Sequence, residues 1–401
     1  MAAYQSFFHY CGIDLTRTPP LGSYLRELYE KWAPDRMGTD AYSTEEIVSL
    51  VRGYLERNRD WAIPELIAAA GSGILYHLGM SATSTDRVDP QRRDGDQGGS
   101  WSKTRYSRDQ ILSFLKNNGA FSPIDFGELA EGAESQAMLV HDRAGNALVL
   151  RIALTRHGFR LDQYAARRFG ARLPIPDVLQ IGKFDERAYF CLTTWVEGEQ
   201  SSKLAIGDLK QALPDIHKAL AELFKLDISF TTGYGPAILP EGDAPYKSWR
   251  EFISESTQMI IEKCVKHARD MNIRESVVED LISQYERHLH YASEVRRLLH
   301  GDPAHDNILI KDGRVSAMID WSCLGYGDWM SDFATISFWS PEEYGDPLLF
   351  AREFDLDDAH VRERMALYWA TNALQVIERA GRYKNKAVCQ WLHDNLERRL
   401  L

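Results

Sequence analysis

The length and composition of the chain predict a globular protein with more than one lobe. It has 401 residues, of which 44% are hydrophobic and 11% aromatic, so it can bury a sizeable core and exceeds one typical domain. The formal net charge of -11 disfavours non-specific binding to nucleic acid and is compatible with cationic ligands.

Cysteine spacing and hydropathy bear on the compartment. The five cysteines are scattered and include no Cys-x-x-Cys pair, so neither a disulfide framework nor a zinc site is expected. The N-terminal sequence lacks the basic start and apolar run of a signal peptide. No apolar run approaches the ~20 residues that span a bilayer. We therefore expect a soluble protein of the reducing cytoplasm.

The N-terminal region is predicted to be helical over residues 1–85. Ser43–Asn58, for example, has apolar residues at helical spacing behind a start that resembles a capping box. Residues 86–103 are polar and rich in Gly and Asp, which is typical of a linker. We find no metal, nucleophile or nucleotide motif before the linker, and a role in homodimerisation or as a lid is our hypothesis.

Residues 104–198 are predicted to form a lobe based on a sheet. A short helix over Arg108–Asn118 precedes four segments with the alternation of strands, and an amphipathic helix around Leu161–Ala171 lies between the second and third. The predicted strands are Ser135–His141, Ala147–Ala153, Asp177–Lys183 and Ala188–Thr194.

Residues 199–401 are predicted to form a mainly helical lobe. Helical patterns run to about Lys225, over about Trp249–Leu298, and from the end of a hairpin at about Asn307–Asp320 to the C-terminus. Strands first and helices later indicate an α+β, bilobal architecture.

The stretch Leu299–Trp321 carries the strongest chemical signal. Asp302, in His-Gly-Asp, and Asn307 have the spacing of the kinase catalytic loop, in which the Asp accepts the proton of the attacking hydroxyl and the Asn binds magnesium. Asp320 is the candidate second metal ligand. Each piece alone is typical of a turn, a cap or a strand end, but their order and spacing favour the catalytic interpretation.

A predicted hairpin brings these groups together. Asp312-Gly313 is a strong turn signal, and centring the turn there pairs Asn307 with about Met318. Asn307 and Asp320 then lie at the open end of the hairpin, beside the loop of Asp302. Such hard oxygen ligands suit a magnesium ion that bridges nucleotide phosphates.

These residues resemble the aminoglycoside phosphotransferases, whose His-Gly-Asp, Asn and Ile-Asp-Trp signature is intact here. The resemblance covers roughly residues 102–375 and is strongest to the hygromycin B phosphotransferases. It implies a protein-kinase-like fold with an antiparallel-sheet N-lobe and a mainly helical C-lobe. The stretches that carry it are ELAEGAES, LVLRI, RFGARLPIPDVLQIG, GYGP followed by SWREFI, and IDWSCLGYGDWMSDFATISFW.

The resemblance implies a site for ATP, with GTP as the alternative, and Mg²⁺. The Gly-rich turn GELAEGAES, which includes Gly132 and Ser135, lets backbone N–H groups approach phosphates, although it is not a Walker A loop. Arg151 takes the place of the usual Lys on the third strand, where its two donors can hold phosphate. Asp162 falls where the family has its helix Glu.

The hinge and the acceptor pocket are assigned in the same way. Backbone groups of Thr194 and Val196 are expected to face adenine. Asp306, Glu342 and Glu343, together with Asp302, are the candidate residues for a polycationic acceptor.

Two further aspartates lie in a sequence pattern that is typical of the start of a helix. Asp328 and Asp332 are more consistent with helix capping than with ligand binding.

Three functions fit these features. The first is ATP-dependent phosphoryl transfer to a hydroxyl of an aminoglycoside or aminocyclitol antibiotic such as hygromycin B, which would confer resistance. The second is a metabolic or biosynthetic kinase for choline, a sugar, a nucleoside or a natural product. The third is an inactive binding protein with a kinase fold, against which the intact Asp302, Asn307 and Asp320 argue. We expect no nucleic-acid or membrane partner.

Overall fold

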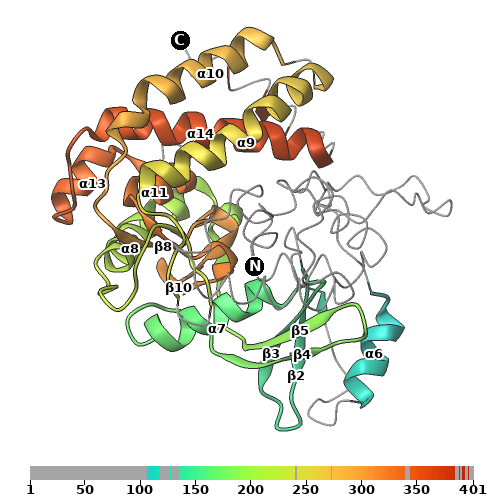
Figure 1. The fold of residues 1–401 in the computed structure, drawn as a ribbon. Helices are drawn as coiled ribbons and strands as arrows, with labels where there is room; N and C mark the ends of the chain where they lie inside the picture. Colours follow the sequence, from blue (N-terminus) through green and yellow to red (C-terminus); the bar gives the residue numbers. More distant parts are fainter. Residues whose placement is uncertain are drawn as a thin grey trace, which may run out of the picture.

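The computed structural model describes residues 106–117, 127–128, 135–239, 242–271, 273–338, 344–383, 388, 391–392 and 396. The predicted N-terminal helices and the linker lie outside these residues. The described chain forms two lobes, a sheet at one end and a group of helices at the other (Figure 1). The predicted α+β, bilobal class is confirmed.

The N-lobe is built on an antiparallel sheet in the order β1-β2-β3-β5-β4. The predicted strands are observed within a residue of their expected bounds. Strand β3 alternates between buried and half-buried residues, so Leu148, Leu150 and Ile152 pack against α6 (Arg108–Asn117) while Val149 and Arg151 face the other side. The bounds are β1 Gly127–Glu128, β2 Gln136–His141, β3 Ala147–Ala153, β4 Val178–Lys183 and β5 Tyr189–Thr194.

Helix α7 (His157–Phe169) lies between the sheet and the C-lobe (Figure 1). It begins earlier than the predicted start at Leu161. The residue before it, Arg156, makes no side-chain capping bond, so the sequence offers no N-cap signal at the true start.

The C-lobe is a group of helices that pack around α14. Helices α9, α10 and α11 all contact α14. Ser248 caps α9, as its side chain accepts a hydrogen bond from the Glu251 amide at 3.1 Å. The bounds are α8 Ile206–Phe224, α9 Trp249–Asp270, α10 Glu275–His288, α11 Trp329–Ser337, α13 Pro347–Glu353 and α14 Val361–Tyr383.

The helical prediction for Trp249–Leu298 is wrong at its end. After α10 and a short 3-10 turn, η3 (Leu289–Tyr291), the chain forms strand β8 (Arg297–Leu299), which pairs with β11 (Gly325–Gly327). Leu298 and Leu299 are buried, and a short apolar run of this kind has no periodicity that separates strand from helix.

The predicted hairpin is present, with a register one residue away from the expected one. Strand β9 (Ile308–Lys311) pairs with β10 (Arg314–Met318), and Met318 lies opposite Ile308 instead of Asn307. The pairing shifts between Val315 and Ala317, which leaves Ser316 as an extra residue. A Cβ on Gly198 would lie 2.4 Å from the Ser316 Oγ, so the bulge packs closely against the glycine at the junction of the two lobes.

Candidate active site

The loop between β8 and β9 carries Asp302, and Asn307 ties this loop together. The Asn307 Nδ2 donates to the Asp302 carbonyl at 2.9 Å, and its amide donates to the Ala304 carbonyl at 2.8 Å. The Asn307 carbonyl accepts from the Ile319 amide at 2.9 Å, next to Asp320. The structure therefore brings Asp302, Asn307 and Asp320 to the open end of the hairpin, where the sequence prediction places them.

Glycine is required immediately before Asp302. Gly301 has φ +81°, and a Cβ there would lie 2.0 Å from the Cys323 carbonyl oxygen. The loop thus approaches the backbone of η5 (Trp321–Cys323) as closely as the missing side chain allows.

Asp332 anchors the loop, a role that the sequence analysis did not assign. Its carboxylate accepts from the His300 amide at 2.7 Å and from the Gly301 amide at 3.1 Å. The capping role expected for Asp332 is therefore wrong, because its oxygens bond another segment instead of the start of α11. Burial raises the pKa of Asp332 to about 7 against the two amide bonds that lower it.

His300 is a packed, neutral residue of this loop. Its Nε2 lies 3.0 Å from the Ile319 carbonyl, and its ring lies 4.5 Å from the Trp321 ring. Complete burial lowers the pKa of His300 to about 4, so at neutral pH the ring is uncharged and Nε2–H donates to Ile319.

Asp302 has the electrostatics of a general base. Burial, together with the nearby charge of Asp320, raises the pKa of its carboxyl to about 6. A carboxylate with this pKa is ionised at neutral pH and more basic than an ordinary aspartate, which suits acceptance of a hydroxyl proton.

Asp320 is held in a special backbone conformation and stays ionised. Its φ is +63°, in the left-handed region that Asp tolerates better than most residues. Enclosure in the cleft would raise the pKa of its carboxyl, but the Arg151 charge and hydrogen bonds from Ser322 hold it below the ordinary value. The side chain is 37% exposed, so a cation can reach it.

Arg151 joins the two lobes. Its Nη1 lies 2.7 Å from Asp162 Oδ2 on α7, its Nη2 lies 3.4 Å from Asp320 Oδ1, and its guanidinium stacks over the Phe159 ring at 5.2 Å. The other Asp162 oxygen accepts from the Trp321 amide at 2.8 Å. The predicted pair of Arg151 and Asp162 therefore forms, and the shorter Asp also bonds the backbone beside Asp320.

Magnesium fits the oxygens of Asn307 and Asp320. Because the Asn307 Nδ2 is used by Asp302, its carbonyl Oδ1 is the end available to a cation. Together with the Asp320 carboxylate it would offer Mg²⁺ two hard oxygen ligands.

The other predicted nucleotide residues have different outcomes. The Thr194 amide donates to the Asp177 carbonyl at 3.0 Å, so this amide is not available to a base. Val196 follows at the link between the lobes. Ser135 is buried directly before β2, and Gly132 lies outside the described residues. Val149, which no motif singled out, shares the face of β3 with Arg151.

The candidate acceptor residues are only partly described. Asp306 is exposed beside the catalytic loop, where its carboxylate accepts from the Ser202 hydroxyl and its carbonyl from Gln200 Nε2 at 3.0 Å. Glu342 and Glu343 lie outside the part of the chain that the structure describes.

Asp328 is the N-cap of α11, as expected, and the centre of a buried network. It accepts from the Met330 amide at 3.0 Å, from Arg364 Nε at 2.9 Å and from the Tyr368 hydroxyl at 2.8 Å.

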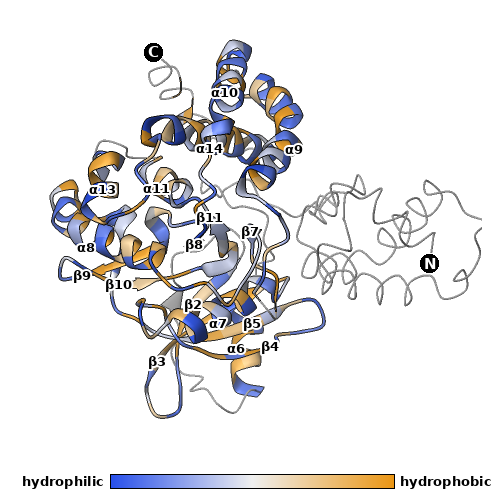
Figure 2. Cartoon of the chain, turned by 60° about the vertical axis from the view of Figure 1, so that its left-hand side comes forward, coloured by the Kyte–Doolittle hydropathy of each residue, from blue (hydrophilic) through white to orange (hydrophobic). Residues whose placement is uncertain are grey.

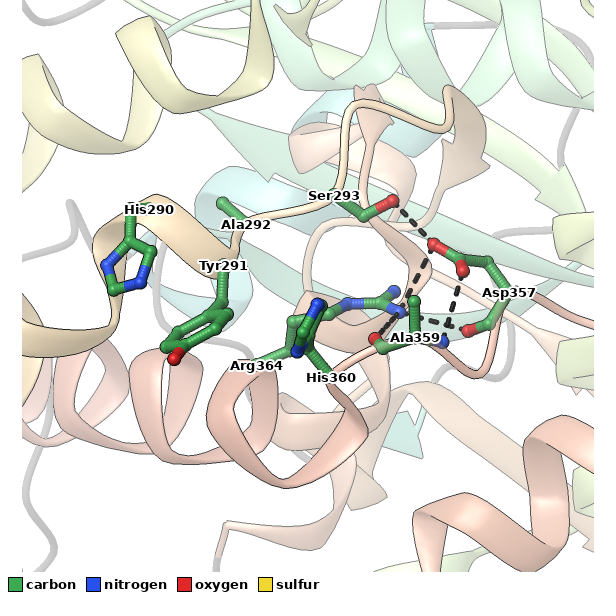
Figure 3. A pocket seen from close by; sticks show the side chains of 8 residues that line it. All are labelled: His290, Tyr291, Ala292, Ser293, Asp357, Ala359, His360 and Arg364. Carbon is green, nitrogen blue, oxygen red and sulfur yellow. Dashed lines mark hydrogen bonds and ion pairs between the residues drawn. The ribbon is translucent and has the colours of Figure 1, made fainter.

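Arg364 also borders a pocket of about 320 Å³ between η3 and the start of α14 (Figure 3). There it donates to the Asp357 carbonyl at 2.9 Å, so its polar groups are satisfied within the protein. No predicted catalytic residue lines this pocket.

Carboxylates and an amide on a helical lobe, opposite an arginine on a small sheet, are the arrangement found in phosphotransferases with the protein-kinase-like fold. The sequence profile of the phosphotransferase enzyme family (APH) matches residues 125–368, more than half of the chain. The chain therefore belongs to this family.

Individual relatives agree with the family match. Hygromycin-B 4-O-kinase of Escherichia coli is 35% identical over 221 residues, and the match spans 54% of this chain but only 63% of that protein. A thermostable mutant of the aminoglycoside phosphotransferase APH(4)-Ia, solved with AMP-PNP and hygromycin B, has a TM-score of 0.59 at 29% identity and covers 72% of this chain and 98% of its own. An aminoglycoside 2'-phosphotransferase solved with GDP shares the fold, with a TM-score of 0.53 at 16% identity over 73% of this chain and 97% of its own.

Proposed function

We propose that the protein is an ATP-dependent O-phosphotransferase whose acceptor is an aminocyclitol antibiotic such as hygromycin B. The observation that carries the proposal is the convergence of Asp302, Asn307 and Asp320 opposite Arg151. The relatives that act on or bind hygromycin B support the choice of acceptor. The net charge of -11 is compatible with a polycationic acceptor.

The described residues suggest how the reaction proceeds. Asp302 orients the acceptor hydroxyl and takes its proton as the oxygen forms a bond to the γ-phosphorus. The bond from that phosphorus to the β–γ bridging oxygen breaks, and ADP leaves with the electron pair. Arg151 holds the phosphates from the sheet side. Asn307 and Asp320 would hold Mg²⁺, which would neutralise part of the phosphate charge.

The remaining assignments extend this proposal. Backbone groups of Thr194 and Val196 would face adenine, the turn with Gly132 and Ser135 would cover the phosphates, and Asp306, Glu342 and Glu343 would contact the acceptor. We place the division of the chain at residues 85, 103 and 198, with a possible homodimer formed through the N-terminal region.

The compartment follows from the substrate. A kinase that uses ATP is expected in the cytoplasm. None of the helices in the described part of the chain is long and apolar enough to cross a lipid bilayer.

The direct test is phosphate transfer from ATP and from GTP to a panel of aminocyclitols, other antibiotics, choline, sugars and nucleosides. We expect ATP-dependent phosphorylation of hygromycin B, and growth of a sensitive bacterium expressing the gene on that drug. The Asp302→Asn variant is the matched control and should give neither result. Turnover of choline, a sugar or a nucleoside alone would instead identify a metabolic kinase.

A further inference from the structure

The two lobes have separate hydrophobic cores, and helix α7 belongs to the core of the C-lobe. The sheet packs against α6 in one cluster, which includes Leu148, Leu150 and Phe190. Four buried apolar residues of α7 belong to the other cluster, which continues through the helices of the C-lobe; they are Leu161, Tyr164, Ala165 and Phe169. The remaining one, Phe159, lies under the guanidinium of Arg151. Although α7 follows β3 in the chain, its apolar face is thus part of the opposite lobe.

Residues 228–239 and 242–246 of the C-lobe, called here the α7-contacting segment, pack against the C-terminal half of α7. Gly242 lies against Tyr164 so closely that a Cβ there would be 2.0 Å from the hydroxyl and 2.4 Å from Cζ. Arg168 stacks over the Phe230 ring at 4.9 Å, and Phe169 lies 6.3 Å from the same ring. These contacts hold the C-terminal half of α7 through the side chains of Tyr164, Arg168 and Phe169.

The α7-contacting segment is itself fixed to the C-lobe. The Ala237 amide donates to the Leu324 carbonyl at 2.9 Å, next to the pairing of β7 (Gly235–Pro236) with β11. Arg296 donates to the Gly233 carbonyl at 2.5 Å and to Thr231 Oγ1 at 2.6 Å, and it stacks over Tyr326 at 4.4 Å. A rigid strand pair therefore supports the surface on which α7 rests.

The inner side of α7 is tied to the catalytic hairpin. The Asp162 carboxylate accepts a hydrogen bond from the Trp321 amide at 2.8 Å. A Cβ on Gly158 would lie 3.0 Å from the Ser322 Cβ. Just beyond the helix, the Met318 amide donates to the Pro174 carbonyl at 2.8 Å. The sheet meets this assembly through Arg151 and its two carboxylates, and through a contact of β4 with α7 that is smaller than the contact of α7 with η5.

We propose that α7 is a fixed part of the C-lobe and that Tyr164 is the positioning residue that keeps Asp162 in place to receive Arg151. The ion pair of Arg151 with Asp162 is then a contact between the lobes, formed when the sheet approaches the C-lobe. Tyr164 acts on nucleotide binding through Asp162. The consequence for nucleotide affinity rests on the proposed function, but the packing of α7 does not.

The first experiment measures amide hydrogen exchange in the full chain without nucleotide, and so does not depend on activity. We expect α7 and the Trp321 amide to exchange as slowly as α8 and β8, and β3 and β5 to exchange faster. The Tyr164→Ala variant should speed exchange in α7 and at Trp321 while leaving β3 unchanged. Exchange of α7 together with the sheet, or an unchanged α7 in Tyr164→Ala, would overturn the proposal.

The second experiment measures Mg-ATP affinity. Tyr164→Ala should raise the Kd about tenfold, since Asp162 no longer holds Arg151, whereas Tyr164→Phe keeps the ring and should change it little. Tyr285→Ala, a lesion of the same residue type buried in α10, should lower the Tm without changing the Kd. Equal effects of the variants at 164 and 285 would contradict a positioning role.

A double-mutant cycle links the two sides of the contact. Gly242→Ala should weaken Mg-ATP binding by pressing on Tyr164, and this effect should shrink in the Tyr164→Ala background. Additive effects would mean that the strain at Gly242, with φ +85°, acts alone, and the proposed coupling would be wrong. If no variant and no wild-type protein bound Mg-ATP while the exchange results held, the proposed function would fail and the packing of α7 would stand.

Discussion

The guanidinium of Arg151 on β3 lies 3.4 Å from the carboxylate of Asp320 at the end of the catalytic hairpin, across the boundary between the lobes. With the bond of Arg151 to Asp162, this contact gives one cation two carboxylate partners. The planar, forked arrangement of donors on arginine is suited to such a site. The presence of arginine instead of the family's usual lysine at position 151 is therefore consistent with the local geometry.

Arg151→Lys tests whether both contacts of the guanidinium are needed. A lysine ammonium is a single point charge, so it cannot contact Asp162 and Asp320 at the same time with two separate nitrogens as the guanidinium does. We expect the KM for ATP to rise by about tenfold, with the overall fold kept as judged by circular dichroism. The control is Arg172→Lys at an exposed pair with Glu222, which should leave the KM unchanged. An unchanged KM in Arg151→Lys would show that charge alone is sufficient.

Asp302→Asn tests the base. The amide cannot accept the hydroxyl proton, so we expect kcat to fall by about 10²–10⁴-fold while the Kd for Mg-ATP stays nearly constant. Asp320→Asn should weaken Mg-ATP binding as well, since Asp320 is the proposed metal ligand. Steady-state kinetics and calorimetry separate the two effects. Retention of most turnover in Asp302→Asn would refute the assignment.

The pH profile follows from the raised pKa of Asp302, about 6. The base works only when ionised, so kcat/KM should be level above pH 6 and fall about tenfold per pH unit below it. Because folding raises the pKa of this acid, its ionisation in the folded state costs stability as the pH rises through 4 to 6. Asp302→Asn should therefore raise the Tm at pH 8 more than at pH 4. The absence of an inflection near pH 6 would contradict the assignment.

Asp332→Asn tests the anchor of the catalytic loop. The amide nitrogen cannot accept a hydrogen bond, so either the His300 or the Gly301 amide loses its partner. We expect a loss of about 1–3 kcal/mol in the free energy of unfolding, measured by denaturant titration, and a lower kcat. Asn372→Asp, a similar change at a half-buried position of α14, is a control that should not change kcat. Normal kcat in Asp332→Asn would show that the anchor is dispensable.

Arg364→Ala tests the buried network behind Asp328. Both side chains are almost fully buried, at 1% and 0% exposure, so removal of one partner leaves an unpaired charge. We expect a loss of about 3–5 kcal/mol of stability in thermal or denaturant unfolding. Arg172→Ala at the exposed pair should change stability by less than about 1 kcal/mol. Equal losses at the two sites would contradict this reading.

The hydropathy of individual residues does not by itself assign α7 to one of the two cores. The strands of the sheet and the helices of the C-lobe each combine apolar and polar stretches, and α7 lies between them (Figure 2). Periodicity predicts which residues of α7 are buried, because apolar residues recur at helical spacing. It does not say which lobe buries them.

The sequence by itself determined the class of fold, the strands of the N-lobe and the trio Asp302, Asn307 and Asp320, because these depend on local periodicity, turn chemistry and fixed spacing. The tertiary structure decided the bulge at Ser316, the strand character of Arg297–Leu299, the anchoring role of Asp332 and the lobe to which α7 belongs. Each of these depends on a partner that is distant in the chain, and one sequence carries no local signal for contacts of that kind.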